Sequence, residues 1–390
     1  MKVFTLFVLL LALCMISQAQ KFTYNQGTAT TKNYYAEIPY ENVSGKLFVD
    51  VEIGGKKHKF LLDTGAPTSL SKEIVDEAKL AVIQKTSVMD VSGQVDTINV
   101  VTSGEIRIGN VGFANIPALA MIPEWYHCWG VDGVIGSNLL RNSIISFDDK
   151  KHLMILTDQL GKLPFLNNKN SAKLTTNTDI QSTPTVKFTL KNNVNLALEF
   201  DTGDNVMMRL TTFVMDQLIK MGVCDILQKG FGANNYGLHG LQKSAEKFMV
   251  NIPFLTIANT RFDHVTTTVN STGIPGLGTR LLDYGIVTLD YIHGKFYLNA
   301  DNPAYDLTAR QWPFQATFAS DKLIVGLVYE KAAEQVKIGQ QILAIDGIDY
   351  TKVTFCNWTT IKPMLEAKET ALFTIKDEQG DIKKLQLSKQ

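Results

Sequence analysis

The chain has no excess of either charge and no long block of one sign, because 38 basic residues balance 38 acidic residues among 390. Proteins that bind nucleic acid normally carry a basic patch or stripe, so this balance argues against nucleic acid as a partner. Low-complexity tracts are absent. After the N-terminus, no apolar run is long enough to span a bilayer. These absences leave a folded chain, long enough for two or three domains, with no predicted transmembrane span.

Cysteine and histidine are also scarce, with four and six copies. The histidines occur singly and without metal-ligand spacing, so no metal site is expected. One of them lies in the stretch 125–129 (WYHCW), for which we expect aromatic packing near a cleft. Apart from Cys14 near the N-terminus, Cys128, Cys224 and Cys356 are an odd number spread along the chain, unlike a disulfide framework. We expect buried free thiols, with at most one disulfide.

The N-terminus has the pattern of a secretory signal peptide. A short basic start precedes the apolar run Val3–Ile16, and small residues follow at Ser17 and Ala19. We therefore expect cleavage near Ala19 and export to a periplasmic or extracellular compartment. Lipoprotein anchoring at Cys14 is the weaker alternative, because the bulky Leu13 stands where that signal requires a small residue.

Two Asp-Thr-Gly triplets each follow an apolar strand pattern. They lie in FLLDTGAPTSL (60–70) and ALEFDTGDNVM (197–207), and their aspartates, Asp63 and Asp201, are 138 residues apart. Before each aspartate, apolar residues alternate on both sides of a polar turn, which predicts a β-hairpin. One such triplet could be an ordinary turn, since Asp and Gly are common there. Two in the same setting predict a repeated unit.

A second pair of segments supports the repeat. Residues 133–156 align without a gap to residues 275–298, which places Gly136 opposite Gly278. Each segment ends in two apolar strands around a short turn. Repeats define architecture, and here they predict two copies of one β-rich unit.

These features resemble the two lobes of an aspartic protease of the pepsin and retropepsin type. The resemblance rests on Asp63-Thr64-Gly65 and Asp201-Thr202-Gly203, and on the later Val134-Ile135-Gly136 and Gly276-Leu277-Gly278, and it covers residues 40–300. It implies a mainly β fold, a two-lobed acid-protease β-barrel pseudo-dimer. It implies an exported endopeptidase that acts on peptide or protein substrates and needs no cofactor.

The resemblance also assigns roles to residues. Asp63 and Asp201 would be the catalytic dyad, in which two close carboxylates share one proton and activate a water. Thr64 and Thr202 would hydrogen-bond to the opposite loop. Gly65 and Gly203 would allow the sharp turns and the close approach of the loops. Gly93 and Gly232 are candidate tips of two flaps, the mobile hairpins that close over a substrate.

Two alternatives remain open. The second triplet is followed by Asp204, where the family usually has Ser, Thr or Ala, and by the unusual run Met207-Met208-Arg209. These departures favour a catalytically inactive peptide-binding protein with a protease-like fold. The second alternative is a homodimeric protease built from the first lobe alone. With both aspartates on one chain, we expect a monomer.

The C-terminal part follows a different pattern after a linker at 299–313. The stretch 324–350 predicts a strand, a short helix near Ala332 and a second strand that ends at Asp346-Gly347; it resembles a PDZ domain of exported bacterial proteins. This resemblance implies an α/β domain that captures a peptide or partner at a sheet edge. The alternative is a packing module that braces the protease lobes. We divide the chain into a signal peptide (1–19), lobe one (20–160), lobe two (161–300) and a PDZ-like domain (312–390).

Overall fold

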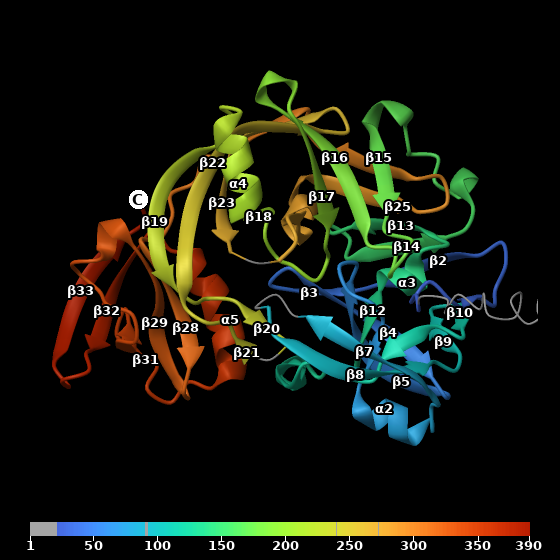
Figure 1. The fold of residues 1–390 in the computed structure, drawn as a ribbon, viewed down its shortest axis with the longest axis horizontal. Helices are drawn as coiled ribbons and strands as arrows, with labels where there is room; N and C mark the ends of the chain where they lie inside the picture. Colours follow the sequence, from blue (N-terminus) through green and yellow to red (C-terminus); the bar gives the residue numbers. More distant parts are fainter. Residues whose placement is uncertain (1–21, 90–92, 239, 272) are drawn as a thin grey trace, which may run out of the picture.

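The computed structural model describes residues 22–89, 93–238, 240–271 and 273–390. The expected signal peptide, its cleavage site near Ala19 and the alternative anchor at Cys14 lie outside the described residues. The described part is mainly β, as the sequence predicts (Figure 1). None of its helices is long and apolar enough to cross a membrane.

Lobe one contains an 11-stranded sheet. Its strands are β1 (Thr28–Ala29), β3 (Glu41–Val43), β4 (Lys46–Ile53), β5 (Lys56–Asp63), β6 (Ser69–Leu70), β7 (Val82–Met89), β8 (Val95–Thr102), β9 (Ile106–Ile108), β10 (Val111–Ala114), β11 (Pro117–Leu119) and β12 (Gly133–Gly136).

A second, larger sheet connects lobe two with the C-terminal unit, which we define as residues 312–390. Its strands up to residue 306 are β2 (Tyr35–Pro39), β13 (Ile144–Asp148), β14 (Leu153–Thr157), β15 (Ser171–Thr176), β16 (Pro184–Leu190), β17 (Asn195–Phe200), β18 (Met208–Thr211), β19 (Asp225–Gly232), β22 (Ala245–Ile257), β23 (Thr260–Asn270), β24 (Gly276–Leu277), β25 (Gly285–Asp290), β26 (Lys295–Ala300) and β27 (Ala304–Asp306). The C-terminal unit adds β28 (Phe314–Ala319), β29 (Lys322–Tyr329), β30 (Gln341–Ile345), β31 (Ile348–Asp349), β32 (Thr370–Lys376) and β33 (Ile382–Ser388).

The remaining elements are short. A small separate hairpin is formed by β20 (Tyr236–Gly237) and β21 (Gly240–Leu241). The α-helices are α2 (Lys72–Glu77), α3 (Ser137–Leu140), α4 (Thr212–Lys220) and α5 (Phe355–Glu366). The 3-10 helices are η1 (Glu124–Trp129), η2 (Leu160–Lys162), η3 (Asn168–Asn170), η4 (Lys191–Asn193), η5 (Thr279–Tyr284) and η6 (Glu330–Ala332).

Each lobe places its aspartate by the same strand arrangement. In lobe one, β12 runs parallel to β5 and antiparallel to β6, so that Gly136 lies opposite Asp63. In lobe two, β24 runs parallel to β17 and antiparallel to β18. The second segment of each repeat therefore threads between the two strands that flank its Asp loop, and it fixes the position where that loop leaves the sheet.

A pseudo-two-fold relation between the lobes is visible in the pairing of β13 with β25. Ser146 and Thr288 lie opposite each other in this antiparallel pair, and the Thr288 hydroxyl donates to Ser146 Oγ at 2.8 Å. These two residues also occupy equivalent positions in the two copies of the repeat, 142 residues apart. A residue that pairs with its own counterpart lies at the two-fold axis, so the axis passes between Ser146 and Thr288.

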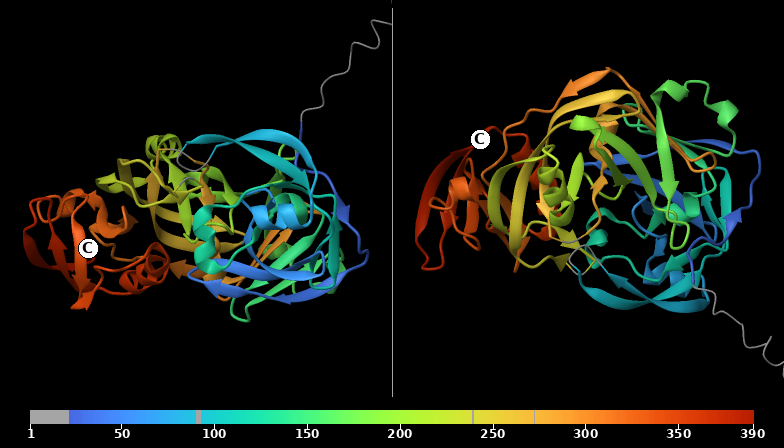
Figure 2. Two further views of the ribbon diagram at one scale, coloured as in Figure 1. Left: turned by 90° about the horizontal axis from the view of Figure 1, so that it is seen from below. Right: turned by 45° about the horizontal axis from the view of Figure 1, so that its top comes forward.

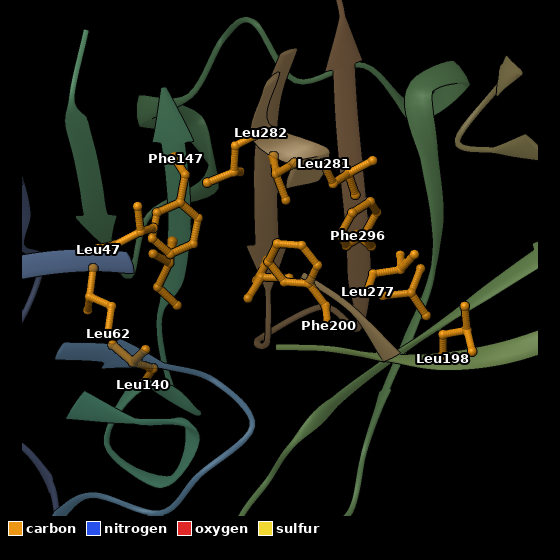
Figure 3. Close-up of a cluster of buried hydrophobic side chains, with 14 of the residues drawn as sticks. Leu47, Leu62, Leu140, Phe147, Leu198, Phe200, Leu277, Leu281, Leu282 and Phe296 are labelled. Atoms are coloured by element: carbon orange, nitrogen blue, oxygen red, sulfur yellow. The ribbon is translucent and has the colours of Figure 1, made fainter. Parts of the chain in front are cut away.

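One continuous apolar core underlies both Asp loops. Leu62 and Phe200, the residues just before the two aspartates, are fully buried in it (Figure 3). The alternating residues of the predicted hairpins, such as Val49 and Val186, point into the same core. Anchoring the residue that precedes each aspartate limits the movement of the loop that carries it, because well-packed interiors resist deformation.

The C-terminal unit has its own core, built around Phe314, Val325 and Phe373. It lies at one end of the molecule beside β19 and β22 (Figures 1 and 2). Two details differ from the sequence prediction. The linker contains β27, which pairs in parallel with β23 of lobe two. The short helix predicted near Ala332 is the 3-10 turn η6, which ends at that residue.

Strand pairing, hydrogen bonds and a disulfide hold the C-terminal unit to both lobes. Strand β29 pairs antiparallel with β19 of lobe two. The Tyr236 hydroxyl, also from lobe two, accepts from the Phe318 backbone N–H at 3.1 Å and donates to the Phe318 carbonyl. A disulfide joins Cys128 in η1 of lobe one to Cys356 in α5. The expectation of free thiols was therefore wrong for this pair and right for Cys224, which is buried and free.

The disulfide predicts a measurable contribution to stability. It closes a loop between residues 228 positions apart, so its loss should lower the free energy of unfolding by about 2–4 kcal/mol. We expect Cys128→Ser, Cys356→Ser and the double variant to lose the same amount in denaturant unfolding. A double variant clearly less stable than either single variant would show that the thiols contribute through packing rather than through the bond.

Candidate active site

The structure brings the two predicted aspartates together. Asp63 is the last residue of β5, and Asp201 directly follows β17. The negative charge of Asp201 acts on Asp63, and each carboxyl group lies against the glycine of the opposite loop. Each loop has the same local geometry, since the Gly65 N–H donates to Asp63 Oδ1 at 3.0 Å and the Gly203 N–H donates to Asp201 Oδ1 at 2.8 Å. One chain therefore supplies both carboxylates of the candidate site.

Thr64 and Thr202 join the two loops by four reciprocal hydrogen bonds. The Thr64 N–H donates to Thr202 Oγ1 at 3.0 Å, and the Thr202 N–H donates to Thr64 Oγ1 at 3.1 Å. Each hydroxyl then donates to the opposite strand, Thr64 to the Phe200 carbonyl at 2.6 Å and Thr202 to the Leu62 carbonyl at 3.0 Å. Both threonines are fully buried. Hydrogen bonds in a site closed to water are expensive to break, so they hold the aspartates in register.

The glycines of the triplets face the opposite carboxylate. A Cβ at Gly65 would lie 2.6 Å from Asp201 Cγ, and a Cβ at Gly203 would lie 2.3 Å from Asp63 Cγ. Both distances are far below a normal contact. Glycine is required at these positions because any side chain would push the two loops apart.

The surroundings of Asp63 and Asp201 favour the state in which the two carboxyl groups hold one proton between them. Burial and the negative charge of Asp201 raise the pKa of Asp63 to about 8, although Lys46 opposes this shift. Two carboxylates this close cannot both ionise easily, so the pair retains a proton through neutral pH. Such coupled titrations belong to the pair as a whole.

Asp204, the predicted departure from the family pattern, is neutralised. It forms an ion pair with Arg209 of β18. The same guanidinium lies 3.1 Å from Asp201 Oδ2 and 3.5 Å from Glu199 Oε2. Burial and the negative charge of Asp201 raise the pKa of Glu199 to about 8. A single cation thus contacts Asp201 of the dyad and two further carboxyl groups beside it.

The candidate flap of lobe one is a hairpin of β7 and β8. Gly93 lies in its turn with φ +80°, a conformation that favours glycine, while residues 90–92 of the predicted tip lie outside the described residues. Met89 and Val95 next to the turn are more than 60 % exposed. The base of the hairpin packs on Tyr24 and, from lobe two, on Leu238. Exposed residues beside the turn and a packed base are the construction expected of a flap.

The second predicted flap tip is misplaced. Gly232 is the last residue of β19 and pairs with Leu327 of the C-terminal unit. A Cβ there would lie 2.1 Å from the Gly326 carbonyl oxygen. Its glycine is therefore explained by close packing between backbones, together with φ +139°. Sequence offset from Asp201 could not separate a hairpin turn from a glycine at such a contact.

The stretch Trp125–Trp129 forms the predicted aromatic packing and lies close to the dyad. Tyr126 is buried, and burial together with the charges of Asp63 and Asp201 raises its pKa. The ring of Trp125 packs edge to face on Tyr126, with 4.7 Å between the ring centroids. It also contacts the ring of Phe355 in the C-terminal unit, at a centroid distance of 6.0 Å. Helix η1 therefore links the candidate site with the C-terminal unit.

One group of metal-type ligands occurs among the described residues. The ligand atoms of His127, Cys128 and Cys356 lie within 4.8 Å of one another. Both sulfurs are joined in the disulfide, and disulfide sulfurs lack the thiolate character of a metal ligand. The sequence could not show this group, because Cys356 comes from a different unit.

Four residues near the dyad were not assigned a role from the sequence. Lys46 Nζ donates to the Gly203 carbonyl, and Gln181 Nε2 donates to the Gly65 carbonyl at 2.9 Å. Glu199 and Arg209 form the charge cluster described above. Glu199 carried a usable signal, since it is a lone acid in an apolar strand directly before a DTG triplet. For Lys46 and Gln181 we find no such signal.

One segment of the chain matches a family model, and two solved structures are similar to parts of the chain. Residues 49–139 match the family model described as aspartyl protease. A retropepsin-like aspartic protease from Rickettsia conorii is 21 % identical over 34 % of this chain and 94 % of its own, with a TM-score of 0.24. An aspartic proteinase from Irpex lacteus is 11 % identical over 68 % of this chain and 97 % of its own, with a TM-score of 0.40. No curated protein matches the chain.

The threonine hydrogen bonds predict a sharp difference between two substitutions. Thr202→Val keeps the shape but leaves the Thr64 N–H and the Leu62 carbonyl without partners, so we expect the free energy of unfolding to fall by about 2–4 kcal/mol. Thr202→Ser keeps the hydroxyl and is the matched control, with an expected loss below about 1.5 kcal/mol. Urea unfolding measures both. Equal losses for Val and Ser would contradict the assigned role of the hydroxyl.

Proposed function

We propose that this protein is an exported aspartic endopeptidase in which Asp63 and Asp201 hydrolyse peptide bonds as one dyad. The observation that carries the proposal is the pair of DTG loops, hydrogen-bonded to each other with each carboxyl pressed against the glycine of the other loop. The aspartyl protease match over residues 49–139 supports it for the first lobe. Since both loops belong to one chain, the protein would act as a monomer.

The dyad would work by general acid–base catalysis. The ionised carboxylate takes a proton from a water lying between the two groups, and the water oxygen attacks the scissile carbonyl carbon. The protonated carboxyl donates its proton to the carbonyl oxygen, which gives a tetrahedral diol. In the collapse, the carboxylate that gave its proton to the carbonyl oxygen takes a proton from one diol hydroxyl, and the C=O bond forms again. The C–N bond breaks, and the amine nitrogen leaves with the proton that the other carboxyl had taken from water, so the dyad again holds one proton. The carboxyl groups supply both acid and base, so the proposal needs no metal or organic cofactor.

For the C-terminal unit, capture of a peptide remains a prediction. The contacts that Tyr236 makes with the backbone of Phe318 occupy part of the edge of β28. The strand pairing with β19 and the disulfide to η1 connect this unit to both lobes. These contacts support the alternative, in which the unit braces the two lobes around the site.

The dyad predicts loss of activity in two single variants. Asp63→Asn and Asp201→Asn should each reduce kcat/KM on a mixed peptide library by at least about 100-fold, because each removes one half of the acid–base pair. Asp50→Asn, an exposed position on β4, is the matched control and should keep full activity. Mass spectrometry of the cleaved peptides gives the rates.

Two other outcomes would each reject a part of the proposal. Activity that survives in Asp201→Asn would indicate a dimer built from lobe one, which a sizing column would detect. A folded parent that binds peptides but cleaves none of them across acidic to neutral pH would indicate the inactive binding protein.

The raised pKa of Asp63 predicts how activity and stability depend on pH. The singly protonated dyad persists until Asp63 ionises, so activity should extend through neutral pH and fall above about pH 8. In the unfolded chain an aspartate ionises near pH 3.9. Its contribution to stability is therefore complete below about pH 4 and is lost as the pH rises towards 8. A parent whose activity already vanishes at pH 6 would contradict this assignment.

A further inference from the structure

Lobe two carries a charge cluster beside its aspartate. Arg209 contacts Asp201 and Glu199 through Nη2, and it contacts Asp204 through Nη1. Its Nε donates to the Ile274 carbonyl at 2.8 Å, which fixes the plane of the guanidinium. The Arg209 and Asp201 side chains are only 17 % and 13 % exposed. Ion pairs shielded in this way are weakly screened by salt, so the cation acts strongly on Asp201.

Lobe one has no charge at the matching positions. The threading strands β12 and β24 align the two lobes residue by residue, because each pairs with both strands that flank its Asp loop. The lobe-one residues that correspond to Glu199, Asp204 and Arg209 are Leu61, Ala66 and Ser69.

Gly276 makes room for this cluster. A Cβ at this position would lie 3.1 Å from Arg209 Nη2, and the corresponding residue of lobe one is Val134. The glycine that stands at position 276, where lobe one has a valine, therefore has a structural reason. Three residues of lobe two that differ in kind from their lobe-one counterparts, Glu199, Asp204 and Gly276, all surround Arg209.

We propose that Arg209 is a positioning residue that keeps Asp201 ionised and leaves the shared proton of the dyad on Asp63. The inference rests on the proposed function and makes it specific. A cation in contact with one of two like-charged carboxylates stabilises the charge on that one, so the proton goes to the other. Asp201 then takes the proton from the attacking water, and Asp63 donates to the carbonyl oxygen.

The other charged groups around the dyad do not reverse this assignment. Lys46, from β4, bonds to the Gly203 carbonyl, and its charge acts on Asp63 less strongly than burial and Asp201 do. Tyr126, from η1, is kept neutral by burial. Asp204 holds Nη1 of the guanidinium and thereby directs Nη2 towards Asp201. Asp204, which in the sequence favoured an inactive protein, therefore helps to place the guanidinium that keeps Asp201 ionised.

The test compares two substitutions of opposite charge. Arg209→Met removes the cation, which should move the acidic limb of the kcat/KM profile to higher pH by about 1–3 pH units. Asp204→Asn removes an anion from the same cluster and should move that limb to lower pH. Arg209→Lys keeps the charge and should restore part of the shift. A merely structural role would lower kcat in all three variants without moving the limbs in opposite directions.

A second readout does not depend on activity. In protein labelled with 13C at the aspartate carboxyl carbon, the Asp201 signal is identified by its loss in Asp201→Asn. We expect its titration midpoint to rise in Arg209→Met and to fall in Asp204→Asn. These shifts in a protein that cleaves no peptide would uphold the role of Arg209 while the proposed function fails. An active enzyme whose limbs and Asp201 signal are unchanged in Arg209→Met would overturn the role of Arg209 and leave the proposed function intact.

Discussion

The reciprocal hydrogen bonds between Thr64 and Thr202 are the interaction on which the site depends. Two buried carboxyl groups can share one proton only while they stay close together, so the loops that carry them must be held. The threonines hold the loops at their base, in a fully buried position where an unmade hydrogen bond is costly. The glycines then allow the carboxyl groups to approach each other above that base.

The Thr64–Thr202 hydrogen bonds obey the same pseudo-two-fold symmetry as Ser146 and Thr288 in the β13–β25 pair. In both pairs, residues at equivalent positions of the two lobes are hydrogen-bonded to each other, as expected of two copies of one unit related by a two-fold axis. The charge cluster around Arg209 breaks that symmetry at the site itself. A nearly symmetric frame thus carries an asymmetric pair of acids, which suits a reaction that needs one base and one acid.

Much of the frame could be predicted from the sequence because it is local and periodic. Alternating apolar residues predict the hairpin of β4 and β5, and the two aligned segments predict the strand pairs β13–β14 and β25–β26. The misassigned Gly232 and the disulfide between Cys128 and Cys356 depend on contacts with the C-terminal unit, which no sequence spacing expresses. The role of Arg209 was hidden for a similar reason. It requires the three-dimensional neighbourhood of three carboxyl groups, one from β17 and two from the loop that follows it.

The measurement that tests the central claim most directly is a double-mutant cycle on the dyad. We would compare kcat/KM of the parent, the two single Asp→Asn variants at positions 63 and 201, and the double variant on one peptide substrate. If the two aspartates act as one unit, the double variant loses no more activity than the more damaged single variant. If the losses multiply, the carboxylates act independently, and the account of a shared dyad is wrong.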